Sequence, residues 1–227
     1  MSERSSGQQK SRRGDTPGGR SGVRAAKAAE TKAALKEAAR GEFVARGYQN
    51  TKITDITAAA GRSTGSFYDH FADKEELLRA LLDDVHEQGH AHFAGEEHPR
   101  DHDLTDRAQL HEHLAVAWRV MADNLGVTTA LYEANVTAGP ASGRAWQRLT
   151  EDTAMLRAHL EYLRGQGRPL PGDPELVAAA IGALLGSLAY ALLPQSAPAY
   201  DGDEVVGTVT SLLLDGLRGP GREPEPE

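Results

Sequence analysis

The chain of 227 residues contains no cysteine. Disulfides and thiolate-based zinc sites are therefore excluded, and a reducing cytoplasm is the expected location. The opening residues carry charge but no apolar stretch, so we expect no signal peptide. Strand patterns are also scarce: the valines at 205, 206 and 209 suggest one, but the apolar spacing continues to Leu212 and Leu217 as in a helix. The sequence therefore predicts an all-α fold.

Charge is distributed unevenly along the chain. The segment from Met1 to Arg62 holds 13 Lys and Arg against 6 Asp and Glu, which is a net charge of +7. The remaining residues hold 12 basic against 27 acidic side chains, which is a net charge of −15. A cationic end attached to an anionic body is typical of proteins that bind nucleic acid through that end. An acidic body that serves only solubility is equally compatible with this pattern.

The first helical pattern follows a segment without apolar periodicity. Residues 1–22 are rich in Gly, Ser, Lys and Arg, and we expect them to form a disordered basic arm. That arm either lies along a DNA minor groove or is a solvated tail. A stripe of apolar residues from Leu35 to Phe43 predicts a helix over 23–46, which Gly47 ends.

Two shorter helices are expected next. Thr51 is placed to cap a helix that runs to Ala60, and Gly61 supplies the backbone freedom for a sharp turn. A third helix covers about 63–70. Its leading end consists of the small residues Ser63, Thr64, Gly65 and Ser66. Small polar side chains allow a helix to enter a groove and bond its lining, as the second helix of a helix-turn-helix motif does with DNA.

The residues that carry a family resemblance lie at fixed spacing in this segment. They are Phe43, Gly47-Tyr48, Thr51, Ile53, Asp55-Ile56, Ala60-Gly61, Ser63, Gly65, Phe67-Tyr68, His70-Phe71 and Asp73-Lys74. With them, residues 31–76 resemble the N-terminal domain of the TetR family of transcriptional regulators. The resemblance implies a three-helix DNA-binding domain in 23–72 and a larger helical ligand-binding and dimerisation domain in 73–218. Residues 219–227 are expected to be a disordered tail.

The resemblance also implies which residues contact DNA. Thr51 would bind a phosphate through its hydroxyl and the neighbouring amides, because helix N-termini attract anions. Base edges would be within reach of Thr64, Gly65 and Ser66, whereas phosphates would be held by Tyr68, His70 and Lys74. Phe67 and Phe71 are expected to pack inward.

Arg62 departs from the family pattern, which has a small apolar residue at this position. We interpret it either as a further phosphate or guanine contact or as a solvated surface arginine.

The body is predicted to consist of helices. They run from about Asp73 to His92 and near 105–124, 126–138, 142–165, 174–193 and 203–217. Ser142 and the Asp173-Pro174 pair are suitable helix starts. Effector contacts are expected from Trp118, Tyr132, Asn135, Met155, His159 and Tyr162. Plain core packing, an interface or a wetted face would explain several of these side chains equally well.

The helices near 174–193 and 203–217 are expected to form a four-helix homodimer interface. Leu176 to Leu193 is uncharged and long enough to span a membrane. Its alanines and glycines and the lack of flanking basic residues argue against a span, and no membrane partner is expected.

The segment His86-Glu87-Gln88-Gly89-His90 matches the H-E-x-x-H pattern of zinc hydrolases. Gly89 weakens the helix that this site needs, so an enzyme is not expected. A metal-sensing repressor that uses His86 and His90 is the stronger alternative, because imidazoles bind Zn, Ni and Cu. Surface histidines without a ligand are the favoured interpretation of this segment.

Taken together, the sequence predicts a homodimeric transcriptional repressor without a bound cofactor. We expect it to leave a palindromic double-stranded DNA operator when a small apolar or aromatic effector binds.

Overall fold

The computed structural model describes residues 18–93 and 102–218. All of the regular structure in these residues is helical, which confirms the predicted all-α class. The first elements are α1 (Gly18–Arg46), α2 (Ile53–Ala59), α3 (Thr64–Tyr68) and α4 (Lys74–Phe93). The body contains α5 (Arg107–Asp123), α6 (Leu125–Ala138), η1 (Pro140–Ser142), α7 (Arg144–Asp152), α8 (Ala154–Gly165), α9 (Pro174–Leu192), α10 (Gly202–Asp215) and η2 (Gly216–Arg218).

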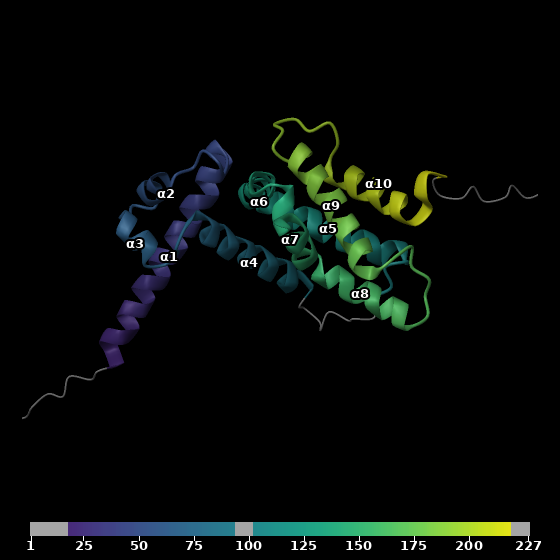
Figure 1. Cartoon of the computed structure of the whole chain (residues 1–227), viewed down its shortest axis with the longest axis horizontal. Helices are drawn as coiled ribbons and strands as arrows, with labels where there is room; N and C mark the ends of the chain where they lie inside the picture. The colour runs from purple at the N-terminus through teal and green to yellow at the C-terminus, as the bar shows by residue number, and fades with distance from the viewer. Residues whose placement is uncertain (1–17, 94–101, 219–227) are drawn as a thin grey trace, which may run out of the picture.

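The helices form two groups, with α4 running between them (Figure 1). In one group α2 and α3 lie beside the long helix α1, and in the other α5 to α10 form a bundle. α1 begins at Gly18, so residues 18–22, which we assigned to the disordered arm, are helical. The alanine-rich segment that follows them has high helix propensity and extends the helix toward its N-terminus. Residues 1–17 of the expected arm and 219–227 of the expected tail lie outside the described residues.

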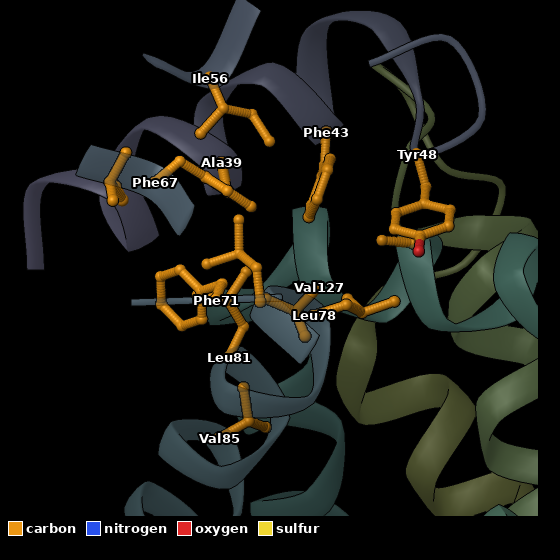
Figure 2. Close-up of a cluster of buried hydrophobic side chains, with 13 residues drawn as sticks. Ala39, Phe43, Tyr48, Ile56, Phe67, Phe71, Leu78, Leu81, Val85 and Val127 are labelled. Carbon is orange, nitrogen blue, oxygen red and sulfur yellow. The ribbon is translucent and has the colours of Figure 1, made fainter. Parts of the chain in front are cut away.

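The first core joins the N-terminal helices to α4 and α6. Figure 2 shows its large side chains pointing toward one another, among them Phe43 of α1, Phe67 of α3 and Phe71 of the connection between α3 and α4. Leu77, Leu78 and Leu81 of α4 and Val127 and Ala130 of α6 belong to the same cluster. The N-terminal helices are therefore packed on a core that continues into the body.

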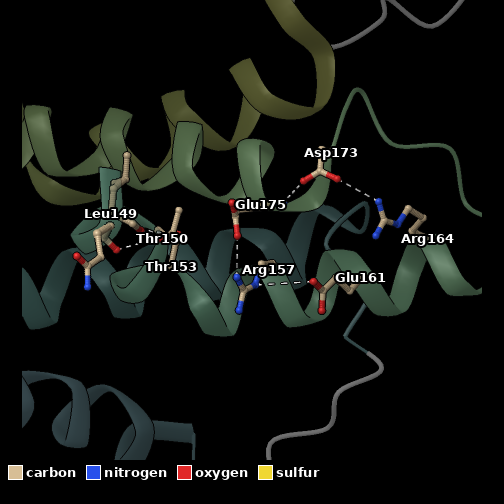
Figure 3. A network of polar contacts seen from close by, with 9 residues as sticks. Leu149, Thr150, Thr153, Arg157, Glu161, Arg164, Asp173 and Glu175 are labelled. Carbon is tan, nitrogen blue, oxygen red and sulfur yellow. Dashed lines mark hydrogen bonds and ion pairs between the residues drawn. The ribbon is translucent and has the colours of Figure 1, made fainter. Parts of the chain in front are cut away.

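The body has a second core around Leu114, Trp118 and Leu185, to which α5, α9 and α10 contribute. Leu104, Leu160, Leu163 and Ala178 form a third and smaller cluster. Ion pairs fix α8 to α9 beside it (Figure 3). Arg157 Nη1 lies 2.9 Å from Glu175 Oε2, and Arg164 Nη1 lies 3.3 Å from Asp173 Oδ2.

The single helix predicted over 142–165 is wrong, because the chain bends at Thr153 and forms α7 and α8. The Thr153 hydroxyl donates to the Leu149 carbonyl oxygen at 2.7 Å, a back-bond that bends helices. α9 also approaches closely here, since a Cβ on Gly182 would lie 2.3 Å from Thr153 Cγ2. Ser142 belongs to η1, and Gly143, with φ of 70°, precedes α7 in its place. Asp173 caps α9 as predicted and accepts from Glu175 N at 3.0 Å.

Within the described residues, α9 is the one helix long and apolar enough to cross a membrane by length and composition. It packs against α5, α6, α7 and α8 and buries Ala178, Ile181, Leu185 and Ala189. A core helix of a helical bundle has the same composition.

Candidate nucleic-acid interface

The N-terminus of α2 is built differently from the prediction. Thr51 is 1% exposed, and its hydroxyl donates to the Gly47 carbonyl oxygen at 2.7 Å. The predicted cap at Thr51 is therefore wrong, whereas its phosphate contact stays a prediction, in which the hydroxyl is buried and already bonded. Lys52 takes the cap position, and its amide donates to Asp55 Oδ2 at 2.9 Å. Thr51 instead fixes the loop between α1 and α2 to the end of α1.

The turn between α2 and α3 follows the prediction. Gly61 has a φ of 61°, which disfavours residues with a Cβ. Ser63 then caps α3, because its hydroxyl accepts from Ser66 N at 3.1 Å. The Ser66 hydroxyl lies 3.0 Å from the Ser63 hydroxyl, so both side chains are held at the start of the helix. Cap and turn together fix the direction in which α3 leaves the turn.

α3 has one apolar and one polar face. Phe67 is completely buried and packs against Phe71 with ring centroids 5.6 Å apart, which confirms that both pack inward. Thr64 and Gly65 are exposed, and Tyr68 is 58% exposed. The large exposed aromatic ring and the small hydroxylated residues lie on the face that the core leaves open. This face is short, polar and supported from behind by a rigid aromatic pair.

Lys74 has a structural role that the sequence did not reveal. Its ammonium donates to the Tyr48 carbonyl oxygen at 2.5 Å and to the Thr51 carbonyl oxygen at 2.8 Å. It also lies 4.2 Å from the centroid of the Tyr48 ring. Burial lowers the pKa of this ammonium below its usual value. Lys74 therefore ties the start of α4 to the loop before α2, and two of its three protons are already used.

Arg62 and His70 lie at the edges of the same surface. Arg62 Nη2 lies 3.0 Å from Glu30 Oε1 on α1. Arg62 therefore already forms an ion pair within the chain, which neither of the two predicted interpretations included. His70 is half-buried beside Phe71. Lys52, which we did not single out, is exposed at the N-terminus of α2. Its position at the start of a helix could have identified it from the sequence, because anions bind at helix N-termini.

The side chains predicted to bind an effector have different surroundings. Trp118 is 8% exposed within the second core, and a Cβ on Gly202 would lie 2.8 Å from its Nε1. Tyr132 stacks on Tyr190 with centroids 4.0 Å apart and is 40% exposed. His159 is buried, whereas Tyr162 is exposed. Asn135 and Met155 are half-buried on α6 and α8.

Two surface depressions in the described part of the chain are lined by other residues. One lies between α5 and α10 and includes Arg107, His111 and Ser211. The other lies between α1 and α6 and includes Arg40 and Asn124. None of the six predicted effector contacts lines either of them. The spacing of residues in the sequence did not reveal the break in the helix predicted over 142–165. This break changes the directions of the side chains that follow it.

The predicted metal ligand His86 has an acidic partner. Its Nε2 lies 3.3 Å from Asp152 Oδ1 on α7, and this hydrogen bond is the main reason that the pKa of His86 is raised. The side chain of His90 lies outside the described residues. Among the described side chains, no group of three His, Cys, Asp or Glu is placed to hold a metal ion.

A different group of histidines, which spacing did not identify, meets inside the body. His102 precedes α5, His113 lies on α5 and His159 lies on α8, and their rings contact one another. They are separated by up to 57 positions in the chain, so only the fold brings them together.

The sequence of the N-terminal helices matches a known family. The family model described as bacterial regulatory proteins, tetR family, matches residues 35–81. This segment starts within α1, ends within α4 and includes both α2 and α3.

Curated relatives match the same end of the chain. The HTH-type transcriptional regulator TtgR of Pseudomonas putida is 46% identical over 67 residues, which cover 30% of this chain and 31% of TtgR. The HTH-type transcriptional repressor BepR of Brucella suis is 36% identical over 72 residues, covering 32% of each chain. The chain thus spans 31% and 32% of the length of these relatives.

Solved structures resemble nearly the whole described fold. The fatty acid degradation regulator FadR from Bacillus halodurans aligns with a TM-score of 0.67 over 84% of this chain and 97% of its own, at 19% identity. A Clostridium perfringens protein described as a regulator of fatty acid metabolism aligns with a TM-score of 0.63 over 81% of this chain and 98% of its own, also at 19% identity. At this level of identity the likeness concerns the fold.

Proposed function

We propose, from an N-terminal domain that belongs to the TetR family of bacterial regulatory proteins, that this protein is a cytoplasmic transcriptional repressor that binds an operator in double-stranded DNA. The observation that carries the proposal is the open face of α3. It presents Thr64, Gly65 and Tyr68 to solvent, while Phe67 anchors the same helix in the core. No catalytic residue is proposed.

The contacts would divide by chemistry. Thr64, Gly65 and Ser66 would meet base edges in the major groove, because they are small and lie at the start of α3. Tyr68, His70, Arg62 and Lys52 would meet phosphates at its edges. Lys74 would contribute mainly by fixing the loop before α2, with its remaining N–H available to the backbone of the DNA.

We further propose a two-fold homodimer through α9 and α10. Only 28% of the apolar window of α9 is buried within the chain. Leu176 on α9 is 58% exposed, and Leu212 and Leu213 on α10 are 38% and 36% exposed. Two copies that pair these helices would bury this surface as a four-helix interface. A two-fold dimer would then require a palindromic operator with half-sites about 34–36 Å apart.

Release of the operator is proposed to proceed through α4 and α6, which touch both helix groups. Asp84 of α4 accepts from Lys36 at 2.6 Å and from Arg40 at 2.8 Å, both on α1. Glu133 of α6 accepts from Gln49 N at 3.2 Å in the loop before α2. An effector that moves either helix would therefore move α1 and change the separation of the two recognition helices.

The effector class is also a proposal. Two structural neighbours are named as regulators of fatty acid metabolism or degradation, which supports an apolar effector in the body. Thermal stability of the chain with a series of fatty acids would test this, and an unchanged Tm for all of them would contradict it.

The test of DNA binding is footprinting on duplex DNA that flanks the coding region of the protein, combined with fluorescence anisotropy. We expect a protected palindrome and a salt slope that reflects several phosphate contacts. Tyr68→Ala should weaken binding, whereas Tyr200→Ala, which removes a ring of equal exposure on the body, should not. Equal affinities of the two variants would contradict the proposal.

A further inference from the structure

Arg148 of α7 has no bonding partner in the described part of the chain. The side chain is half-buried, and its Nη1 is buried without a hydrogen-bond acceptor. Arg62 and Arg157 also have one buried nitrogen without an acceptor, but each is paired through another nitrogen, with Glu30 and Glu175 respectively. Arg148 forms no ion pair with any described residue. A buried charged donor without an acceptor is destabilising, so its presence calls for an explanation.

The carboxylates on either side of Arg148 are already engaged. Arg144, Arg148 and Asp152 follow one another at intervals of four residues, so they share one face of α7. At one end of this face Arg144 Nη1 lies 3.1 Å from Glu75 Oε1 of α4. At the other end Asp152 Oδ1 lies 3.3 Å from His86 Nε2, also on α4. Arg148 therefore lies between two pairs that join α7 to α4, and it has no acid of its own.

A second donor without a partner lies near Arg148. The Tyr48 hydroxyl has no hydrogen-bond partner among the described residues. Burial, followed by the charges of Glu75 and Asp73, raises the pKa of Tyr48, so the hydroxyl keeps its proton at pH 7. The charge of Arg148 opposes this rise, which means that the guanidinium is close enough to act on the hydroxyl. Asp73 is itself engaged, since its Oδ1 accepts from Glu76 N at 2.8 Å.

We infer that Arg148 and Tyr48 bind an anionic oxygen group, a carboxylate or a phosphate, at the head of the effector. A planar guanidinium can donate two parallel N–H groups to such a head group, and the hydroxyl would add a third donor. This inference rests on the proposed function, because it adds an acidic head to the apolar effector proposed there.

The position of this site connects it to the DNA-binding helices. Tyr48 lies in the loop between α1 and α2, and its carbonyl oxygen accepts from Lys74 of α4. An anion bound by Arg148 and Tyr48 would join α7 to this loop. Effector binding would thus act on the loop that precedes α2 as well as on α4.

The test uses the full-length chain without DNA and probes that share one alkyl chain: dodecanoate, dodecyl phosphate and dodecanol. Calorimetry gives the affinity for each probe. We expect at least one of the two anions to bind roughly 10–100-fold more tightly than the alcohol, as a charged hydrogen bond implies. Arg148→Gln should remove this difference and leave the affinity for dodecanol unchanged, whereas Tyr48→Phe should reduce the difference. Arg164→Gln, which removes an exposed arginine of α8, is the matched control and should bind all probes like the original chain.

A second measurement separates recognition from a structural role. Arg148→Met keeps the apolar stem and removes a guanidinium that bonds nothing, so the Tm without ligand should stay unchanged or rise. Arg157→Met breaks the pair with Glu175 and should lower the Tm. A decrease in Arg148→Met as large as that in Arg157→Met would make Arg148 a structural residue and overturn the inference.

The binding results distinguish this inference from the proposed function. Equal affinities of the original chain for both anions and the alcohol would overturn the inference but leave an apolar effector in place. An anion preference that Arg148→Gln retains would overturn it too. If no probe bound, the inference and the alkyl effector would both be wrong, whereas operator binding would still be decided by footprinting.

Discussion

At the scale of single residues, Lys74 shows how a charged side chain stabilises the N-terminal domain without reaching a partner charge. Its ammonium binds two backbone carbonyl oxygens of the loop that precedes α2. These carbonyls lie in the loop after α1, outside the hydrogen-bond pattern of a helix. The resemblance drew attention to Lys74 for its charge, whereas the structure shows that its hydrogen bonds fix the loop.

Replacement of Lys74 by methionine should lower the free energy of unfolding by roughly 1.5–3 kcal/mol, the usual contribution of a charged hydrogen-bond donor. Methionine keeps the apolar length of the side chain but leaves both carbonyls unbonded. Urea denaturation measures the change. Lys52→Met, at an exposed position, should change it by less than about 0.5 kcal/mol, and equal effects of the two substitutions would contradict this role.

His113 should make stability depend on pH. Its pKa is about 4 in the folded chain and 6.5 in the unfolded chain, so the unfolded state binds more protons between these values. Stability is fully present above pH 6.5 and falls as the pH drops toward 4, by an amount on the order of 3 kcal/mol. Urea denaturation at a series of pH values, with a chelator present, measures this decrease.

In His113→Gln the decrease between pH 6.5 and about 4 should be smaller, whereas the exposed His111→Gln should keep it. If His113→Gln retained the full decrease, burial of this imidazole would not be its cause. His86 should act in the opposite direction, because its hydrogen bond to Asp152 raises its pKa. Its contribution is present below pH 6.5 and is lost as the pH rises above that value.

At the scale of elements, α1 and α6 approach each other unusually closely at Gly126. A Cβ at this position would lie 2.7 Å from the Arg40 carbonyl oxygen and 2.9 Å from Val44 Cγ2. The carbonyl belongs to the backbone of α1 and cannot move without moving the helix. This contact joins the DNA-binding helices to the body as directly as the ion pairs of Asp84 do.

Gly126→Ala should therefore destabilise the chain by roughly 1–3 kcal/mol, the usual cost of overpacking. Gly89→Ala is the matched control, since a Cβ on Gly89 meets nothing within 4 Å on α4. It should stabilise the chain by about 0.5–1 kcal/mol. Thermal and urea denaturation give both values, and a neutral Gly126→Ala would show that α1 and α6 are not held this closely.

The helices themselves were mostly predictable, because their apolar periodicity and glycine ends are local signals. Gly47 and Gly61 have the positive φ values that the predicted ends and turn require. The cap of α2 was not predictable in this way: Thr51 suits a cap, but Lys52 takes that position and its amide donates to Asp55. At the bend at Thr153, α9 approaches closely through Gly182, and this tertiary contact could not be predicted from the segment alone.

At the scale of the whole molecule, the pair of α9 and α10 exposes several apolar side chains in the described part of the single chain, among them Leu176, Leu212 and Leu213. Phe67 and Phe71 were correctly assigned to the core from local sequence. The effector contacts stay a prediction, because they lie on α5, α6 and α8 and depend on how these helices of the body meet. The histidine cluster is the clearest case, since its members become neighbours only through tertiary packing.

Leu213→Glu should convert a dimer into a monomer, because it places a charge on a half-exposed leucine of the proposed interface. Light scattering coupled to size exclusion measures the mass. Leu217→Glu, at a position already 96% exposed, is the control and should leave the mass unchanged. A monomeric original chain, or a Leu213→Glu variant that stays dimeric, would contradict the proposed interface.

The central claim is that the start of α3 reads base edges in the major groove. The most direct measurement compares affinities for the operator and for unrelated duplex DNA, in the original chain, Thr64→Val and Lys52→Ala. We predict that Thr64→Val lowers the ratio of the two affinities by about 1–3 kcal/mol, as loss of a base contact does. Lys52→Ala should weaken both affinities alike and reduce the salt slope by about one unit. If Thr64→Val left the ratio unchanged and Lys52→Ala altered it, α3 would not be the element that reads the sequence.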